Sequence, residues 1–157
     1  MYLIIAILTI ILSAFFSGVE IAFISSNKLQ LELDKGSEKM SSKVISFFSR
    51  NESNFITTML IGNNVSLVIY GIIMAKLLTP YLQYFAFNAY YLLFVQTIIS
   101  TSIILVTAEF LPKSIFKIYP NKTLRIFALP IFVFFILLKP FVWFFMQASN
   151  LIIKLFF

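Results

Sequence analysis

Residues 2–25 form an uninterrupted apolar stretch, YLIIAILTIILSAFFSGVEIAFIS, which decides the fold class of this chain. As an α-helix the stretch would be about 36 Å long at 1.5 Å per residue, enough to cross a bilayer with some tilt. It lacks the positively charged start of a cleavable signal peptide, and its apolar run continues through Ile24. We therefore predict a membrane-spanning helix that is retained in the mature protein.

The composition of the whole chain agrees with that of its first segment. The 157 residues are 61% hydrophobic and only 11% charged, whereas soluble domains carry about 25% charged residues. A soluble domain of this size has too small an interior for 20 Phe. The absence of Cys and His makes a zinc or copper site very unfavourable. We predict an all-α membrane protein with several spans.

Two further apolar stretches predict spans at residues 55–78 and 90–112. The segment 27–54 between the first two spans is polar, with five basic and four acidic residues, and has apolar positions at helical spacing. This pattern indicates two short amphipathic helices at the membrane surface, interrupted near residues 36–37. Residues 51–54, Asn-Glu-Ser-Asn, provide turn and N-cap chemistry for the following helix.

The last apolar stretch, residues 126–157, is long enough for a fourth span but has Lys139-Pro140 at its middle. The pieces on either side are 13 residues each, about 20 Å, which is too short to cross alone. A Lys at mid-span costs about 2.5–3.5 kcal/mol on insertion scales. We therefore favour a bent, membrane-associated segment whose many aromatic side chains face lipid or the interface.

The basic residues predict the orientation of the chain in the membrane. Nine of the 12 lie in residues 27–54 and 113–125, whereas the connection 79–91, which contains Pro80, has none. Because basic loops stay in the cytosol, we expect an outside N-terminus, three spans and a cytosolic C-terminus. The net charge of +6 is assigned to this asymmetry rather than to nucleic acid. The chain ends within apolar sequence, as a fragment of a longer protein would.

Two of the six acidic residues, Glu20 and Glu109, lie within predicted spans. An ionisable side chain there is costly and usually faces the interior of the bundle or a watery cavity. By helical rise, Glu20 lies about 8 Å and Glu109 about 5 Å from the cytosolic ends of their helices. Glu20 could instead pair with Lys28 or Lys113.

Neutral polar residues occur at similar depth, with Ser17 about 12 Å and Asn63-Asn64 about 12–14 Å from the cytosolic ends of their helices. Gly18 and Gly62 beside them allow close helix approach or exposed carbonyls. Such hard oxygen ligands suit Mg²⁺, Ca²⁺ or Na⁺. Alternatively, Ser and Asn only join helices by hydrogen bonds, and for Ser13, Ser17 or Thr57 taken singly both readings stay open.

Pro112 follows Glu109 by three residues and has no N–H, so a carbonyl of the preceding turn loses its helical partner. A helix broken in this way can expose carbonyls to a cation, and a simple helix end at the membrane edge is equally compatible with the spacing. The sequence contains no phosphate-binding loop and no pairing of a nucleophile with a base, so we expect no enzymatic activity.

Three motifs in order, FFSGVEIAF (residues 15–23), TTMLIGNN (57–64) and AEFLPKS (108–114), resemble the transmembrane domain of the cyclin M (CNNM)/CorC magnesium transporters. The resemblance implies a homodimer in a plasma or bacterial inner membrane. Each protomer would have three transmembrane helices, juxtamembrane helices and a belt-like segment at 113–157. It also implies Mg²⁺ export coupled to Na⁺ entry, and cytosolic CBS-pair domains, which this chain lacks.

The resemblance also implies site residues. Ser17, Asn63 and Glu109 match the family's motif serine, first motif asparagine and the acid before Leu-Pro-Lys, and are the main ligand candidates. Asn64 and Glu20 are second candidates. The family often has another Asn four positions after the first, where this chain has Leu67.

Two other functions remain open from the sequence. One is a Mg²⁺ sensor or membrane anchor for cytosolic regulatory domains, without transport. The other is a four-span exporter of small molecules with Glu20 or Glu109 as a proton-coupled acid, which requires an extracellular C-terminus.

Overall fold

The computed structural model describes residues 1–27, 40–85 and 88–156, and these ranges are almost entirely helical. In chain order the elements are α1 (Tyr2–Ser25), α3 (Met40–Arg50), α4 (Glu52–Leu82), α5 (Ala89–Ile104), the π-helical segment η2 (Leu105–Phe110), α6 (Leu111–Ile118) and α7 (Pro120–Phe156). No strand occurs in the described ranges. The predicted all-α class is confirmed.

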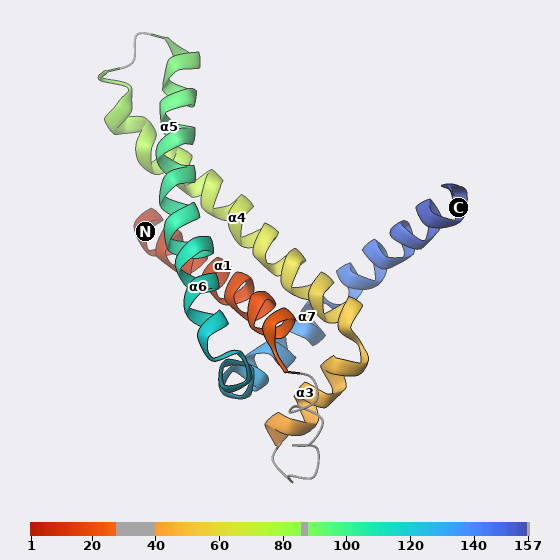
Figure 1. The fold of residues 1–157 in the computed structure, drawn as a ribbon. Coiled ribbons are helices and arrows are strands. Elements are labelled where there is room, and N and C mark those ends of the chain that lie inside the picture. The colour runs from red at the N-terminus through yellow and green to blue at the C-terminus, as the bar shows by residue number, and fades with distance from the viewer. Residues whose placement is uncertain (28–39, 86–87, 157) are drawn as a thin grey trace.

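Helix α1 lies at the centre of the arrangement. It packs chiefly against α4 and also contacts α6, η2 and α7. Figure 1 shows that α4 and α5 lie next to each other at the end of the molecule opposite α3 and diverge away from that end. The interface between α4 and α5 is less extensive than that between α1 and α4.

Four helical stretches are long and apolar enough to cross a membrane: Tyr2–Ser25, Glu52–Leu82, Ala89–Ile118 and Pro120–Lys154. The second is longer than the predicted span 55–78, because the helix continues through Pro80 to Leu82. A proline near a helix end removes few hydrogen bonds, and the Gln83 N–H still donates to the Thr79 carbonyl. The multi-pass membrane architecture is therefore confirmed, with four candidate spans.

The predicted end of the third span near Pro112 is not observed, since helical structure continues to Ile118. The reason lies in the preceding turn, where the Leu111 N–H donates to the Val106 carbonyl, five residues back, in place of the α-helical four. A proline ring clashes with the carbonyl four residues before it in an α-helix. The wider π-turn of η2 relieves that clash, so the chain passes Pro112 without leaving the helix.

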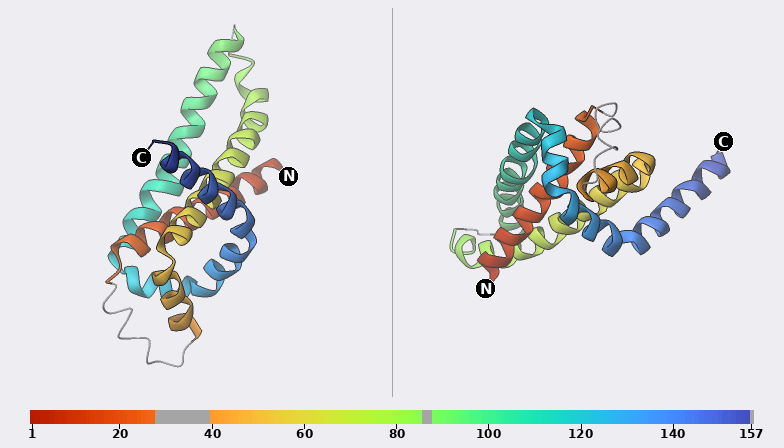
Figure 2. Two further views of the ribbon diagram at one scale, coloured as in Figure 1. Left: turned by 90° about the vertical axis from the view of Figure 1, so that its right-hand side faces the viewer. Right: turned by 90° about the horizontal axis from the view of Figure 1, so that it is seen from below.

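The last apolar stretch forms one helix, α7, with Pro130 and Pro140 inside it. Figure 2 shows that α7 is bent and that its C-terminal part leads away from the other helices. Prolines within a helix are a common cause of such bends. The predicted bend is observed, but it does not interrupt the helix at Lys139-Pro140.

An aromatic core joins α7 to α1, α3 and the start of α4. The ring centroid of Phe55 lies 4.2 Å from that of Phe23 and 4.8 Å from that of Phe48, and both ring pairs are tilted. Phe135 lies 5.3 Å from Phe48 and is buried. The expectation that the aromatic side chains of the last segment face lipid or the interface is therefore wrong for Phe135, and Phe132 and Phe134 also pack partly buried against this core.

Helix α3 is amphipathic and buries Val44, Ile45 and Phe48 against this core. It corresponds to the second of the two predicted surface helices, and the first falls outside the described residues. Asn51 is the N-cap of α4, as predicted, but its side-chain amide donates to the Phe47 carbonyl at 3.0 Å instead of capping α4.

Candidate functional site

One side of the candidate site is a row of three hydroxyl side chains on α1. Thr9, Ser13 and Ser17 follow one another at four-residue intervals and are all buried, because this spacing places them on one face of the helix. The Thr9 hydroxyl donates within its own helix, to the Ala6 carbonyl at 2.8 Å. The other two hydroxyls remain available to neighbouring helices.

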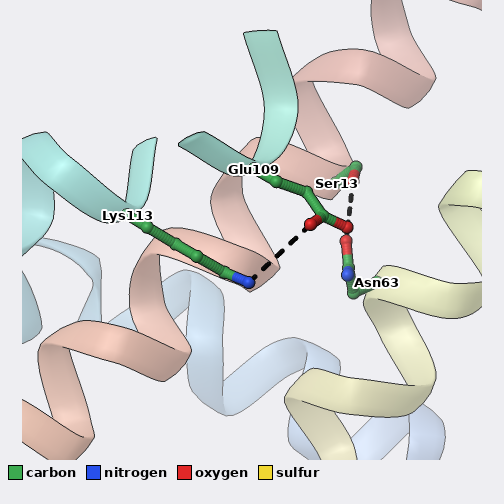
Figure 3. Close-up of polar contacts among 4 residues, drawn as sticks. All are labelled: Ser13, Asn63, Glu109 and Lys113. Atoms are coloured by element: carbon green, nitrogen blue, oxygen red, sulfur yellow. Dashed lines mark hydrogen bonds and ion pairs between the residues drawn. The ribbon is translucent and has the colours of Figure 1, made fainter. Parts of the chain in front are cut away.

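The Ser13 hydroxyl donates to Oδ1 of Asn63 at 2.6 Å, which joins α1 to α4 (Figure 3). Both side chains are buried, and Asn63 is 8% exposed. Gly62 allows this close approach, since a Cβ added there would lie 2.5 Å from the ring of Phe16 on α1. The hydrogen bond therefore depends on a glycine next to the asparagine.

Glu109 adds a carboxylate from a third helical element, η2. Its side chain is 30% exposed, and Oε2 lies 3.9 Å from Nζ of Lys113. In Figure 3 the carboxylate extends from η2 toward the Ser13–Asn63 pair. A π-turn carries an extra residue and so changes the direction of the side chains around it. The irregular backbone at Glu109 is therefore the π-turn and not a helix break at Pro112. Pro112 is buried in the first turn of α6.

Ser17 is fully buried, and its hydroxyl has no hydrogen-bond partner among the described residues. A buried hydroxyl without a partner costs about 1–3 kcal/mol, so such a group calls for an explanation. Ser17 lies one turn from Ser13 on the same face of α1. A ligand bound beside the Ser13–Asn63 pair would supply the missing partner.

The remaining candidate residues from the sequence differ in burial and in how near they lie to these side chains. Asn64 is exposed, because one residue along a helix rotates the side chain by about 100° away from Asn63. Glu20 is partly buried and lies close enough to Lys113 and Glu109 to interact with their charges. Lys28, its other predicted partner, falls outside the described residues. Gly18 lies against the ring of Phe116 on α6, because a Cβ added at Gly18 would be 2.4 Å from a ring atom.

Ser13 was not among the predicted ligand residues, although it contributes the direct contact between α1 and Asn63. The signal that could have found it is its four-residue spacing from Ser17. Leu67, the position at which the family often has Asn, is partly buried, and Ser66 beside it donates to the Gly62 carbonyl of its own helix at 2.8 Å.

Three elements contribute to this region: α1 and α4 through the Ser13–Asn63 hydrogen bond, α1 also through the Ser17 hydroxyl one turn away, and η2 through the Glu109 carboxylate that extends toward the pair in Figure 3. We use the term polar cluster for Ser13, Ser17, Asn63 and Glu109. Within the described ranges no group of three or more acidic, His or Cys side chains gathers that could hold a metal ion. The polar cluster thus offers one negative charge and neutral oxygens, a set that suits a hard cation held loosely.

The helices and the polar cluster define a multi-pass membrane protein with a polar site inside the bundle. The family model of the cyclin M transmembrane N-terminal domain (CNNM) matches residues 4–157, and the chain belongs to this family. The predicted family is thereby confirmed, and with it a membrane role in Mg²⁺ transport or sensing. The family is one of membrane transporters and not of enzymes. No individual curated protein matches the chain.

Proposed function

We propose that the protein exports Mg²⁺ across the membrane and that the polar cluster is its ion site. The observation that carries this proposal is the Ser17 hydroxyl, which is fully buried without a partner next to the Ser13–Asn63 hydrogen bond. Glu109 provides the charge, and Ser17 and Asn63 provide neutral oxygens. Glu20 and Asn64 are second candidates, of which Glu20 has the better position because it lies near Glu109.

The charge balance of the cluster favours weak binding. Lys113 lies 3.9 Å from the Glu109 carboxylate and competes with a cation for it. Mg²⁺ loses its water shell reluctantly, so a site with one carboxylate holds it weakly. Weak binding suits a carrier, which must release its ion on the other side. Alternating access with Na⁺ entry as the driving reaction completes the proposal.

Removing the charge of Glu109 while keeping its shape tests the site. We expect Glu109→Gln to reduce Mg²⁺ flux in proteoliposomes to the level of liposomes without protein. Glu52→Gln is the matched control, since Glu52 lies in the first turn of α4, outside the polar cluster. Wild-type flux in Glu109→Gln would overturn the site assignment.

The same assay separates transport from sensing. A wild-type protein that binds Mg²⁺, as measured by calorimetry, but carries no flux in either direction would favour the sensor. Equal flux with and without a Na⁺ gradient would remove Na⁺ coupling from the proposal and leave Mg²⁺ transport in place.

We further propose three spans with an outside N-terminus, a cytosolic C-terminus and a belt-like α7 that lies along the lipid. Lys139 is exposed near the middle of α7 and supports this arrangement, since a lysine at mid-span is costly. The chain has no Cys, so Tyr2→Cys and Asn150→Cys can each be the single thiol. Labelling them with an impermeant thiol reagent in intact cells reports on which side of the membrane each end lies. Labelling of both from outside would show a fourth crossing and favour the small-molecule exporter.

The remaining part of the proposal concerns assembly. We expect a homodimer in the plasma or bacterial inner membrane, surrounded by lipid, that works together with cytosolic CBS-pair domains. Support for this comes from the family membership. Mass measurement of the purified protein in detergent tests the dimer directly.

A further inference from the structure

A groove between α4 and α5 leads away from the polar cluster. Its volume is about 480 Å³, and its lining includes Tyr70 and Gly71 from α4, Thr97 and Thr101 from α5, and Glu109 from η2. Glu109 therefore belongs both to the polar cluster and to one end of this groove. On α5 the lining runs from Ile104 back to Leu93, toward the start of this helix.

The α5 side of the groove combines apolar side chains, Leu93 and Ile104, with several polar ones, although α5 is a membrane helix. Gln96, Thr97, Ser100 and Thr101 recur at helical spacing and all line the groove. Polar side chains are costly in contact with hydrocarbon and usually face a protein interior or water. Phe94 and Ile98, exposed positions of the same helix outside the groove lining, are large and apolar. Helix α5 thus contributes several polar side chains to the groove.

The α4 side of the groove is open at Gly71, an exposed position. A Cβ added at Gly71 would meet no atom within 4 Å, so the space beside this glycine is open. Thr97 precedes Glu109 by 12 residues, about 18 Å along a helix. The groove therefore covers much of the distance between the polar cluster and the membrane face opposite the basic residues of α3 and α6.

We propose that this groove is a hydrated pathway by which the cation passes between the polar cluster and that opposite face of the membrane. The proposal rests on the proposed transport function. Glu109 stands at the inner end, where the cation is exchanged with the cluster. Hydroxyl and amide groups along α5 replace part of the water shell of the cation as it passes.

Thiol labelling tests whether the groove contains water, without depending on transport. The chain has no Cys, so Thr97→Cys and Thr101→Cys can each be the single thiol. Phe94→Cys and Ile98→Cys, at exposed positions of the same helix, are the controls. Because the reactive thiolate forms only where water reaches it, we expect a membrane-impermeant thiol reagent to modify the groove positions at least about tenfold faster.

Two results of the labelling experiment would overturn the pathway. Equal labelling of groove and control positions would show that the groove is no wetter than the lipid-facing surface. Protection of Thr97→Cys and Thr101→Cys together with disulfide cross-linking between two copies would show that a second copy of the chain fills the groove.

A second experiment fills the groove. We expect Gly71→Phe to abolish Mg²⁺ flux in proteoliposomes while Mg²⁺ still binds, because the ring occupies open space and leaves the polar cluster in place. Ile72→Phe adds similar bulk on an exposed position of the same helix and should retain wild-type flux. Wild-type flux in Gly71→Phe would overturn the pathway, whereas a wild-type protein without flux but with fast labelling would refute only the transport function.

Discussion

Helix α4 makes two interfaces that differ in how closely the partner helix approaches. At the interface with α1, Gly62 lies against the ring of Phe16, and an added Cβ would be 2.5 Å from it. At the interface with α5, Gly71 has no atom within 4 Å of the corresponding position. The same residue type in one helix therefore serves close packing at one interface and leaves open space at the other.

The difference teaches how a membrane domain can combine a fixed site with a passage to it. The α1–α4 interface buries Ser13, Ser17 and Asn63, and close packing holds their oxygens in place. The α4–α5 interface has polar groups and a cavity of about 480 Å³. Glu109 belongs to both regions, so it is the residue at which binding and passage meet.

The largest difference between the two interfaces is expected for alanine at the two glycines. Phe16 is buried between the rings of Phe15 and Phe134 and has little room to move when a methyl group arrives. Gly62→Ala should therefore lower the free energy of unfolding by about 1–3 kcal/mol, the usual cost of overpacking. Gly71→Ala should leave it unchanged or raise it by up to about 1 kcal/mol, since alanine favours the helix.

Thermal unfolding of the purified proteins in detergent, followed by circular dichroism, measures both effects. Equal melting temperatures for the two variants would show that the interfaces do not differ in packing, and would contradict the comparison.

A smaller effect on stability is expected when the Ser13–Asn63 hydrogen bond between α1 and α4 is removed. Asn63→Ala leaves the buried Ser13 hydroxyl without its partner, which should cost about 1–2 kcal/mol of stability. It should also weaken Mg²⁺ binding in calorimetry. Asn64→Ala, next to it but exposed, is the matched control and should change neither quantity. Equal effects at the two positions would remove Asn63 from the ion site.

This pair of asparagines also shows what could be predicted from the sequence. Hydropathy and length predicted a multi-pass helical membrane protein, but the second and third helical stretches are longer than predicted and Pro120–Lys154 is a fourth candidate span. The family motifs singled out Asn63 and Glu109. They did not separate Asn63 from Asn64 by burial, nor reveal the bond from Ser13. Which side of a helix faces a neighbour depends on its rotation, and here the side with Gly62 lies against Phe16 of α1.

The backbone conformation around Pro112 could not be predicted from the sequence either. Proline predicts an interrupted helix because it lacks an N–H and clashes with the preceding turn. The chain instead contains the π-turn of η2 directly before it, and η2 and α6 both pack against α1. The groove could not be predicted either, because a cavity results from how two helices diverge and not from either helix alone.

The smallest expected effect concerns a hydrogen bond that links α4 to the backbone of α5. The Tyr70 hydroxyl donates to the Ser100 carbonyl at 3.1 Å, beside the groove. Interhelical hydrogen bonds in membranes average about 0.6 kcal/mol, so Tyr70→Phe should lower the melting temperature only slightly. If the bond holds α5 close to α4, the groove should become wetter in this variant, and Thr101→Cys should be labelled faster in its background. Slower or unchanged labelling would show that the α4–α5 interface keeps its width without this bond, and that the open space at Gly71 is set by the divergence of the helices themselves.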